Sequence, residues 1–172
     1  MKGSLLALAR AVLVASGCGG SSKSATRTVG ADGSLNVAIK VVKHGRQVIA
    51  LVPVTIDGKG PYTFALDTGA SQSLVDSAVA RDLGVKQSDG SHRVAGITDV
   101  TKVHTIHVKD WRVGDVELPA TTVVEANLPF GNASGGVQGL LGSDMLSQFD
   151  VVTIDYAHGM LRLHQRSVKT SG

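Results

Sequence analysis

The sequence is poor in the residues that define several common protein classes. It has one cysteine, four prolines and only 3% aromatic residues in 172 positions. A lone cysteine cannot form an internal disulfide, so the chain is not a small scaffold held together by disulfides. With 42% hydrophobic residues and 21 glycines, the composition is typical of one folded, turn-rich domain rather than a disordered or fibrous chain.

The chain also lacks an excess of charge. Its formal charge is +3, but Lys2 and Arg10 lie in a segment that we expect to be removed. Taking them from the 17 basic residues leaves 15 against 14 acidic residues. This balance gives no reason to expect a nucleic-acid partner.

Several enzyme signatures are missing as well. The sequence contains no G-x-S-x-G, no phosphate-binding G-x-x-x-x-G-K-[ST], no H-E-x-x-H and no cysteine pair. His104 and His107 are close in sequence, but an i, i+3 spacing on one strand points them to opposite faces. We therefore expect no metal site and no cofactor.

The N-terminal residues have the pattern of an export signal. Residues 1–17 combine Lys2 with a short apolar run that is too short to span a bilayer, which is typical of a signal peptide. Residues 15–18, Ala-Ser-Gly-Cys, resemble a bacterial lipobox, in which the cysteine is lipidated. The resemblance implies a lipoprotein anchored to a membrane of the cell envelope through Cys18. Plain secretion, or a cytosolic chain with a chance cysteine, are the alternatives.

The remaining chain divides into a tether, one domain and a tail. Residues 18–34 are rich in Gly, Ser and Thr and predict a flexible tether. Alternating apolar residues then indicate strands, and the Gly-containing segments 44–45 and 57–60 indicate hairpin turns. The domain is expected over 35–166, followed by a tail at 167–172. The predicted strands are 35–43, 46–56, 61–67, 91–97, 101–109, 111–118 and 121–126, with a final hairpin that turns near 158–159.

Two short helices complete the prediction. The sequence Ser73-Leu74-Val75-Asp76 is typical of a capping box, and Gly84 is a stop signal. A second helix is expected over residues 143–148, with Asp144 as its cap. The fold class is therefore mostly β with one or two short helices.

Two motifs point to one chemistry. Residues 67–71, Asp-Thr-Gly-Ala-Ser, follow an apolar strand, and residues 139–142, Gly-Leu-Leu-Gly, come far downstream. Together with "PVTIDGKGPYTFALDTGAS" and "GLLGSDMLSQFDVVTIDY", they resemble the retropepsin-like aspartic proteases, and are most similar to the single-domain bacterial members. The resemblance covers about residues 46–164 and implies a retropepsin-like acid-protease β-barrel.

The resemblance also implies an activity, an assembly and roles for residues. It implies an aspartic endopeptidase, a peptide hydrolase in which Asp67 is catalytic and Thr68, Gly69 and Ala70 form the active-site loop. Thr68 would bond to the partner loop, and Ala70 follows the retroviral pattern. Because the chain carries one Asp-Thr-Gly and no internal repeat, Asp67 must meet its copy in a homodimer. The partners are then a protein or peptide substrate and a second copy of the chain.

The substrate-binding flap departs from the family pattern. Residues 91–100 fall at the expected distance, which places Val94, Ala95, Gly96 and Ile97 in the flap. The segment carries no aromatic residue, so closure over a substrate would differ from that of pepsin-like enzymes.

Other interpretations remain open. The domain could be a retropepsin-fold module that binds an extended peptide as an added strand without cleaving it. The Asp67 motif could also be an Asx-type turn, and residues 139–142 a closely packed strand corner. Asp155 is expected to be structural, and Trp111 to be a partly buried anchor.

Overall fold

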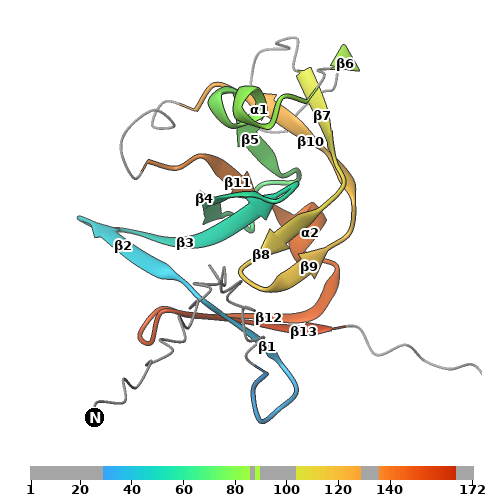
Figure 1. The fold of residues 1–172 in the computed structure, drawn as a ribbon. Coiled ribbons are helices and arrows are strands. Elements are labelled where there is room, and N and C mark those ends of the chain that lie inside the picture. Colours follow the sequence, from blue (N-terminus) through green and yellow to red (C-terminus); the bar gives the residue numbers. More distant parts are fainter. Residues whose placement is uncertain (1–28, 86–87, 90–103, 129–135, 166–172) are drawn as a thin grey trace, which may run out of the picture.

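The computed structural model describes residues 29–85, 88–89, 104–128 and 136–165. This part of the chain is mostly β, with two sheets and two short helices (Figure 1). The predicted fold class is therefore confirmed. No helix among these residues is both long enough and apolar enough to cross a membrane.

The smaller sheet joins the two ends of the domain. Its order is β1 (Leu35–Ala38), β13 (Met160–Gln165) and β12 (Phe149–Asp155), and all pairs are antiparallel. Residues 29–34, expected at the end of the tether, form a turn in which the Gly30 N–H donates to the Ser34 carbonyl at 2.7 Å. The predicted final hairpin is the β12–β13 connection.

The first predicted strand, 35–43, is two strands in the structure. β1 pairs with β13, whereas β2 (Lys40–His44) pairs with β3 (Gln47–Ile56) in the larger sheet. Ile39 lies between them, and its N–H donates to the Gly159 carbonyl at 2.9 Å. The sequence pattern did not reveal this change of sheet, because the apolar alternation continues from β1 through Ile39 into β2.

The larger sheet carries the other strands. Its path is β6-β7-β10-β5-β11-β4-β3-β8-β9, and β2 pairs with β3 beside this path. The predicted turns at 44–45 and 57–60 coincide with the β2–β3 and β3–β4 connections, although His44 belongs to β2 and residues 59–60 belong to β4. The bounds are β4 (Lys59–Leu66), β5 (Leu74–Asp76), β6 (Ser88–Asp89), β7 (His104–Val108), β8 (Trp111–Val113), β9 (Val116–Leu118), β10 (Thr121–Ala126) and β11 (Gly139–Leu141).

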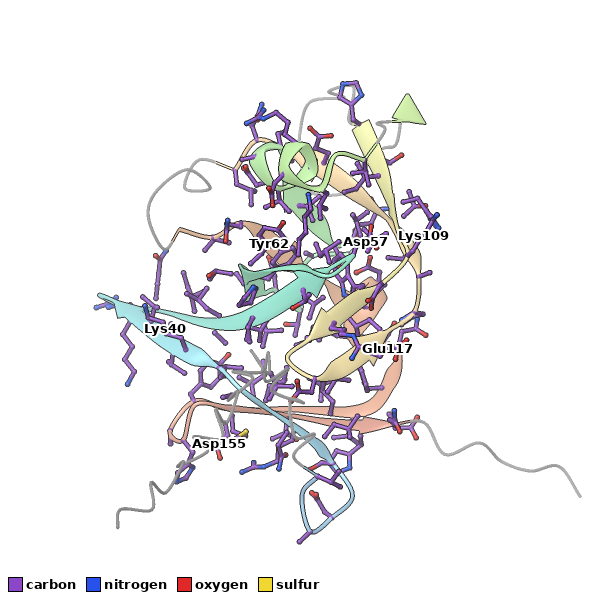
Figure 2. The ribbon with its side chains drawn as sticks, in the orientation of Figure 1. Lys40, Asp57, Tyr62, Lys109, Glu117 and Asp155 are labelled. Carbon is purple, nitrogen blue, oxygen red and sulfur yellow. The ribbon has the colours of Figure 1, made fainter. Side chains whose placement is uncertain are left out.

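The predicted strand 111–118 is divided at Gly114 into β8 and β9, and this residue has a positive φ of 56°. Most of 101–109 is confirmed as β7, while the strand expected at 91–97 lies outside the described residues. At the β3–β4 turn, Asp57 Oδ1 accepts the backbone N–H groups of Lys109 and Asp110 at 3.3 and 2.9 Å (Figure 2). This contact fixes the β3–β4 turn against the β7–β8 turn.

The capping-box prediction at Ser73 is wrong. Helix α1 spans Ser77–Leu83, and its N-cap is Asp76, whose carboxylate accepts the Ala78 N–H at 2.8 Å. The preceding residues form β5, because they pair with both β10 and β11. The helix ends at Gly84 with a φ of 69°, as the sequence predicts.

The core is built around an aromatic pair. Trp111 is completely buried rather than partly buried, and its ring meets Phe64 edge to face with centroids 5.7 Å apart. The aliphatic side chains of this core cluster come from strands of both sheets and from both helices. Asp155, expected to be structural, accepts hydrogen bonds from the His158 backbone and the Arg162 side chain. The bond from the His158 N–H is the main reason that the pKa of Asp155 is lowered to about 2.

Leu141 gives the first prediction. Its side chain is 2% exposed and belongs to the core cluster, whereas Leu140 is half-buried. Leu141→Ala should lower the free energy of unfolding by about 2 to 5 kcal/mol, because it removes buried surface and leaves a cavity. Leu140→Ala, the matched control on the same strand, should lower it less. Equal losses in denaturant unfolding would contradict this assignment.

Candidate active site

The Asp67 motif occupies a loop that the Gly-Leu-Leu strand holds at both ends. β4 ends at Leu66, and the loop of residues 67–73 leads to β5. β11 lies between these two strands, parallel to β4 and antiparallel to β5. The two motifs that the sequence singled out, far apart in the chain, are therefore neighbours in one sheet.

The loop begins with a tight turn around the Asp67 carboxylate. The Asp67 N–H donates to the Leu141 carbonyl at 3.1 Å, and the Ala70 N–H donates to the Asp67 carbonyl at 3.2 Å. Asp67 Oδ1 accepts the Gly69 N–H at 3.0 Å. A Cβ on Gly69 would lie 3.3 Å from that oxygen, so a side chain there would crowd the carboxylate.

The loop leaves the Asp67 carboxylate open for further contacts. Asp67 is half-buried, and Thr68 and Gly69 are exposed. Within the described part of the chain, the Gly69 N–H is the only hydrogen-bond donor to this carboxylate. The group thus has a fixed position and free acceptor capacity.

The beginning of helix α2 (Ser143–Leu146) holds the middle of the loop. The backbone N–H and the hydroxyl of Ser143 both donate to the Ala70 carbonyl, at 2.8 and 2.9 Å. Gly142 allows this approach, because a Cβ there would come within 2.9 Å of the Ala70 and Gln72 carbonyl oxygens. The helix is two residues shorter than the predicted 143–148.

A buried hydrogen-bond network holds the end of the loop. The Asp144 carboxylate accepts the Ser73 N–H at 2.9 Å, the Ser73 hydroxyl at 2.7 Å and the Met145 N–H at 2.9 Å. The Ser73 hydroxyl also accepts the Gly142 N–H at 2.9 Å, and Ser73 has no exposed surface. Sequence reasoning missed this network, although both residues lie within or beside the two motifs.

The role predicted for Asp144 is therefore corrected. The N-cap of α2 is Gly142, which has no side chain to make a capping bond, and Asp144 lies in the first turn. Its carboxylate bonds mainly to Ser73, 71 residues earlier in the chain. Asp144 connects the two motifs and is not the N-cap residue of the helix.

The structure does not describe the other predicted site residues. Val94, Ala95, Gly96 and Ile97 of the expected flap lie outside the described residues, as does Cys18. His104 and His107 on β7 are both exposed. In the described ranges, no group of three or more His, Cys, Asp or Glu side chains is arranged to hold a metal ion.

Comparison with known proteins gives a family match and a fold match. A family model described as aspartyl protease matches residues 52–145, more than half of the chain. The fold is similar to a retropepsin-like aspartic protease from Rickettsia conorii, with a TM-score of 0.55 and 19% identity over 77% of this chain and 91% of that chain. This similarity confirms the predicted retropepsin-like fold. No match was found among curated proteins.

Two further solved structures align less closely. The EIAV protease complexed with the inhibitor HBY-793 aligns with a TM-score of 0.46 and 20% identity, over 62% of this chain and 92% of that chain. The retroviral protease-like domain of Ddi1 from Leishmania major aligns with a TM-score of 0.44 and 18% identity, over 67% and 89%.

Proposed function

The chain belongs to the aspartyl protease family, and from this premise we propose that it is an aspartic endopeptidase that acts as a homodimer. The family match and the retropepsin-like fold support a protease-type function. The proposal that Asp67 is catalytic rests on the geometry of its loop. The Asp67 carboxylate accepts the backbone N–H of Gly69, in a turn where Thr68 and Gly69 are exposed.

The need for a second subunit follows from the number of catalytic carboxylates. Peptide hydrolysis by aspartate requires one carboxylate to accept a proton while another donates one. This sequence has one Asp-Thr-Gly motif. A twofold axis that passes beside Asp67 would supply the second carboxylate from the partner, since such an axis brings the same residue of both subunits together.

The proposed reaction uses the pair as acid and base. Two carboxylates within hydrogen-bonding distance share one proton, because both cannot be ionised at that separation. The ionised Asp67 takes a proton from a water molecule, whose oxygen attacks the peptide carbonyl carbon, while the protonated Asp67 donates to the carbonyl oxygen. The Asp67 carboxyl that took the water proton then donates it to the peptide nitrogen, the C–N bond breaks, and the other Asp67 takes a hydroxyl proton from the intermediate, which restores the shared proton.

The loop geometry supports such chemistry. A catalytic carboxylate must be held close to its productive position, and rigid supporting contacts provide this. Bonds to Leu141, Ser143 and Asp144 hold the beginning, middle and end of the loop. Thr68 is exposed in the single chain, and we assign its hydroxyl to a bond with the partner loop.

The protease assignment is tested by cleavage and assembly measured on the same protein. A purified chain lacking residues 1–18 should cleave casein or a peptide library at some pH between about 3 and 7, where a carboxylate pair can hold one proton. Specific activity should fall on dilution in parallel with the dimer fraction seen by sedimentation. Pepstatin should inhibit, because its hydroxyl occupies the position of the attacking water.

Two outcomes would overturn the proposal. If specific activity stays constant while the protein dissociates to monomers, the two subunits do not share a catalytic carboxylate pair. Peptide binding without cleavage at any pH in the range would favour the binding module instead.

We also propose that the protein is exported and held on a membrane of the cell envelope by lipidation of Cys18. The proposal rests on the order of Lys2, an apolar run, small residues and Cys18. Cys18→Ala should move the protein from the membrane fraction to the soluble fraction, and globomycin should cause unprocessed precursor to accumulate. If neither treatment changes the fractionation, the anchor proposal is wrong.

A further inference from the structure

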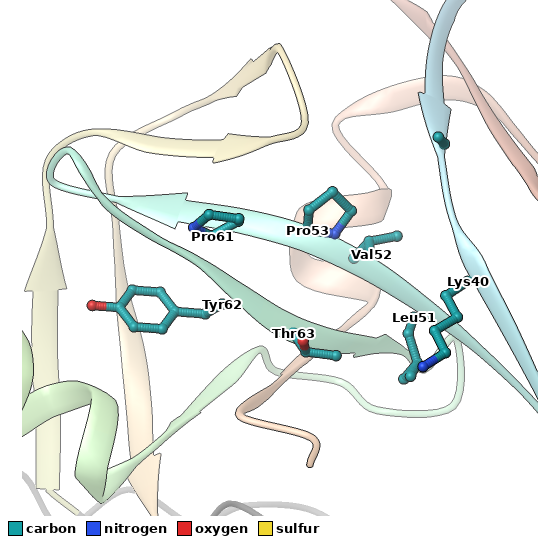
Figure 3. Close-up of a pocket in the computed structure, with 8 residues that line it drawn as sticks. Lys40, Leu51, Val52, Pro53, Pro61, Tyr62 and Thr63 are labelled. Carbon is teal, nitrogen blue, oxygen red and sulfur yellow. The ribbon is translucent and has the colours of Figure 1, made fainter. Parts of the chain in front are cut away.

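A groove on the outer surface of the β3–β4 hairpin has no role in the function proposed above. It is a cavity of about 230 Å³ between β1, β2 and the hairpin (Figure 3). Its lining is mainly apolar, with one charged side chain. The residues include Ala38, Lys40, Leu51, Pro53, Pro61 and Thr63.

The groove lies along β4, and the C-terminal end of this strand leads into the Asp67 loop. Side chains alternate along a strand, so Thr63 and Ala65 of β4 lie on one face of the sheet. The strand register extends this face sideways, since Ala65 pairs with Leu51 and Leu51 pairs with Lys40. Thr63 and Asp67 are four residues apart, which is about 13 Å along an extended chain.

The floor of the groove is held rigidly in the single chain. Thr63 exchanges two hydrogen bonds with Gln138, donating its N–H to Gln138 Oε1 at 3.0 Å and accepting the Gln138 N–H at 2.7 Å. Tyr62 anchors the neighbouring position, because its ring is buried and its hydroxyl donates to Asp82. The groove is therefore formed before any ligand arrives, as binding sites usually are.

The size and chemistry of the groove indicate what it could hold. Sites for whole small molecules have volumes of about 300 to 1,000 Å³, so this groove fits one apolar side chain better than a cofactor. Lys40 is exposed at the rim (Figure 2), and it has no ion-pair partner in the described part of the chain. A carboxylate next to the apolar side chain would complement this charge.

We propose that the groove is a distal specificity site for peptide substrates. It takes an apolar side chain about four residues from the cleaved bond, and Lys40 pairs with an acidic residue next to that side chain. The spacing follows from the four residues between Thr63 and Asp67, which is about 13 Å at about 3.3 Å per extended residue. The identity of the ligand as a peptide substrate rests on the proposed peptide-hydrolase function. The groove that would bind it does not depend on that function.

The binding surface can be tested without catalysis. The ¹⁵N-labelled Asp67→Asn protein is titrated with acetyl-Gly-Leu-Glu-Gly-amide, and backbone amide shifts are followed by NMR. We expect the amides of Lys40, Leu51, Val52 and Thr63 to shift together. Acetyl-Gly-Ser-Gln-Gly-amide, which lacks both the apolar side chain and the charge, should cause no such shifts.

Single substitutions distinguish the contribution of the apolar groove to peptide binding from that of the Lys40 charge. Lys40→Glu should weaken binding of the Leu-Glu peptide about threefold to tenfold, because an exposed attraction becomes a repulsion. The matched control is Lys43→Glu, which makes the same charge change on the opposite face of β2 and should leave binding unchanged. Ala38 is exposed beside the groove, so a Phe side chain at this position should fill the groove. Ala38→Phe should therefore weaken peptide binding although Lys40 is unchanged.

Cleavage by the wild type supplies the second readout. In a dodecapeptide library sequenced by mass spectrometry, apolar-acidic pairs should be enriched about four residues from the cleaved bond, and Lys40→Glu should remove the acidic preference. The distal site is refuted if the Leu-Glu peptide shifts none of the groove amides, or if Lys43→Glu weakens binding as much as Lys40→Glu. A peptide that binds the groove while the wild type cleaves nothing would contradict only the proposed protease activity.

Discussion

Asp67→Asn is expected to abolish peptide cleavage, by about 10⁴-fold or more, while leaving the fold intact. One substitution removes both ionisable groups of the proposed pair, because each subunit carries the same change. Asn is nearly isosteric with Asp, and its side-chain oxygen can still accept the Gly69 N–H that Asp67 Oδ1 accepts in the structure. Cleavage rate, thermal unfolding and sedimentation of the purified variant test this prediction.

The dimerisation of Asp67→Asn gives a second test of the proposed carboxylate pair. Two neutral amides at the twofold axis do not repel, so dimerisation of Asp67→Asn should be unchanged or tighter. Asp115→Asn makes the same chemical change outside the loop, and should retain wild-type activity. Wild-type cleavage by Asp67→Asn would exclude the aspartic-protease mechanism.

Thr68→Ala distinguishes positioning from chemistry. Its hydroxyl is exposed in the single chain and is proposed to bond to the partner loop. Because both subunits lose that bond, at about 1 kcal/mol each, the dimer should be weakened by about 2 kcal/mol, or about thirtyfold in the dissociation constant. Activity should then recover at high protein concentration, in contrast to Asp67→Asn.

Asp144→Ala is expected to destabilise the protein by about 3 kcal/mol or more and to reduce kcat over tenfold. The change removes an acceptor of three hydrogen bonds, and leaves the N–H and hydroxyl of the completely buried Ser73 without their acceptor. The loop that carries Asp67 loses its bonds at Ser73, and small displacements of a reacting group have large effects on rate. Denaturant unfolding and steady-state kinetics measure the two effects.

Asp144→Asn gives an internal control for this network. One side-chain oxygen remains and can accept from Met145 and the Ser73 hydroxyl, but the amide NH₂ would face the Ser73 N–H. Its stability and kcat should fall between those of the wild type and Asp144→Ala. Asp115→Ala, which removes a carboxylate elsewhere, should change little. If Asp144→Ala unfolds at the wild-type denaturant concentration, the network has no stabilising role.

Local sequence patterns predicted the turns and most strands, and failed where a residue has a partner far away in the chain. The glycines at 45 and 58 mark hairpins because each has a positive φ, which a residue without a Cβ adopts readily. The sequence around Ser73 is typical of a helix cap, but the Ser73 hydroxyl donates to Asp144 and accepts the Gly142 N–H. The pattern could not show that a distant carboxylate would compete for it.

The same limit explains the errors at Trp111 and in the first strand. Whether Trp111 is buried depends on Phe64, which packs against it from another strand. The apolar alternation of 35–43 continues through Ile39, although the chain changes sheets there. Alternation reports which side chains are buried, and gives no information on which strand they pair with.

The sequence by itself determined the mostly β fold, the Asp67 loop after a strand and the presence of one Asp-Thr-Gly motif, on which the proposed homodimer rests. These features depend on residues close together in the chain, such as alternating apolar positions and glycine turns. Only the tertiary structure decided that β11 lies between β4 and β5, that Asp144 holds Ser73, and that Lys40 borders an apolar groove. The reason is that each of these contacts joins distant segments, and their geometry is set by strand register and by closure of the loops between them.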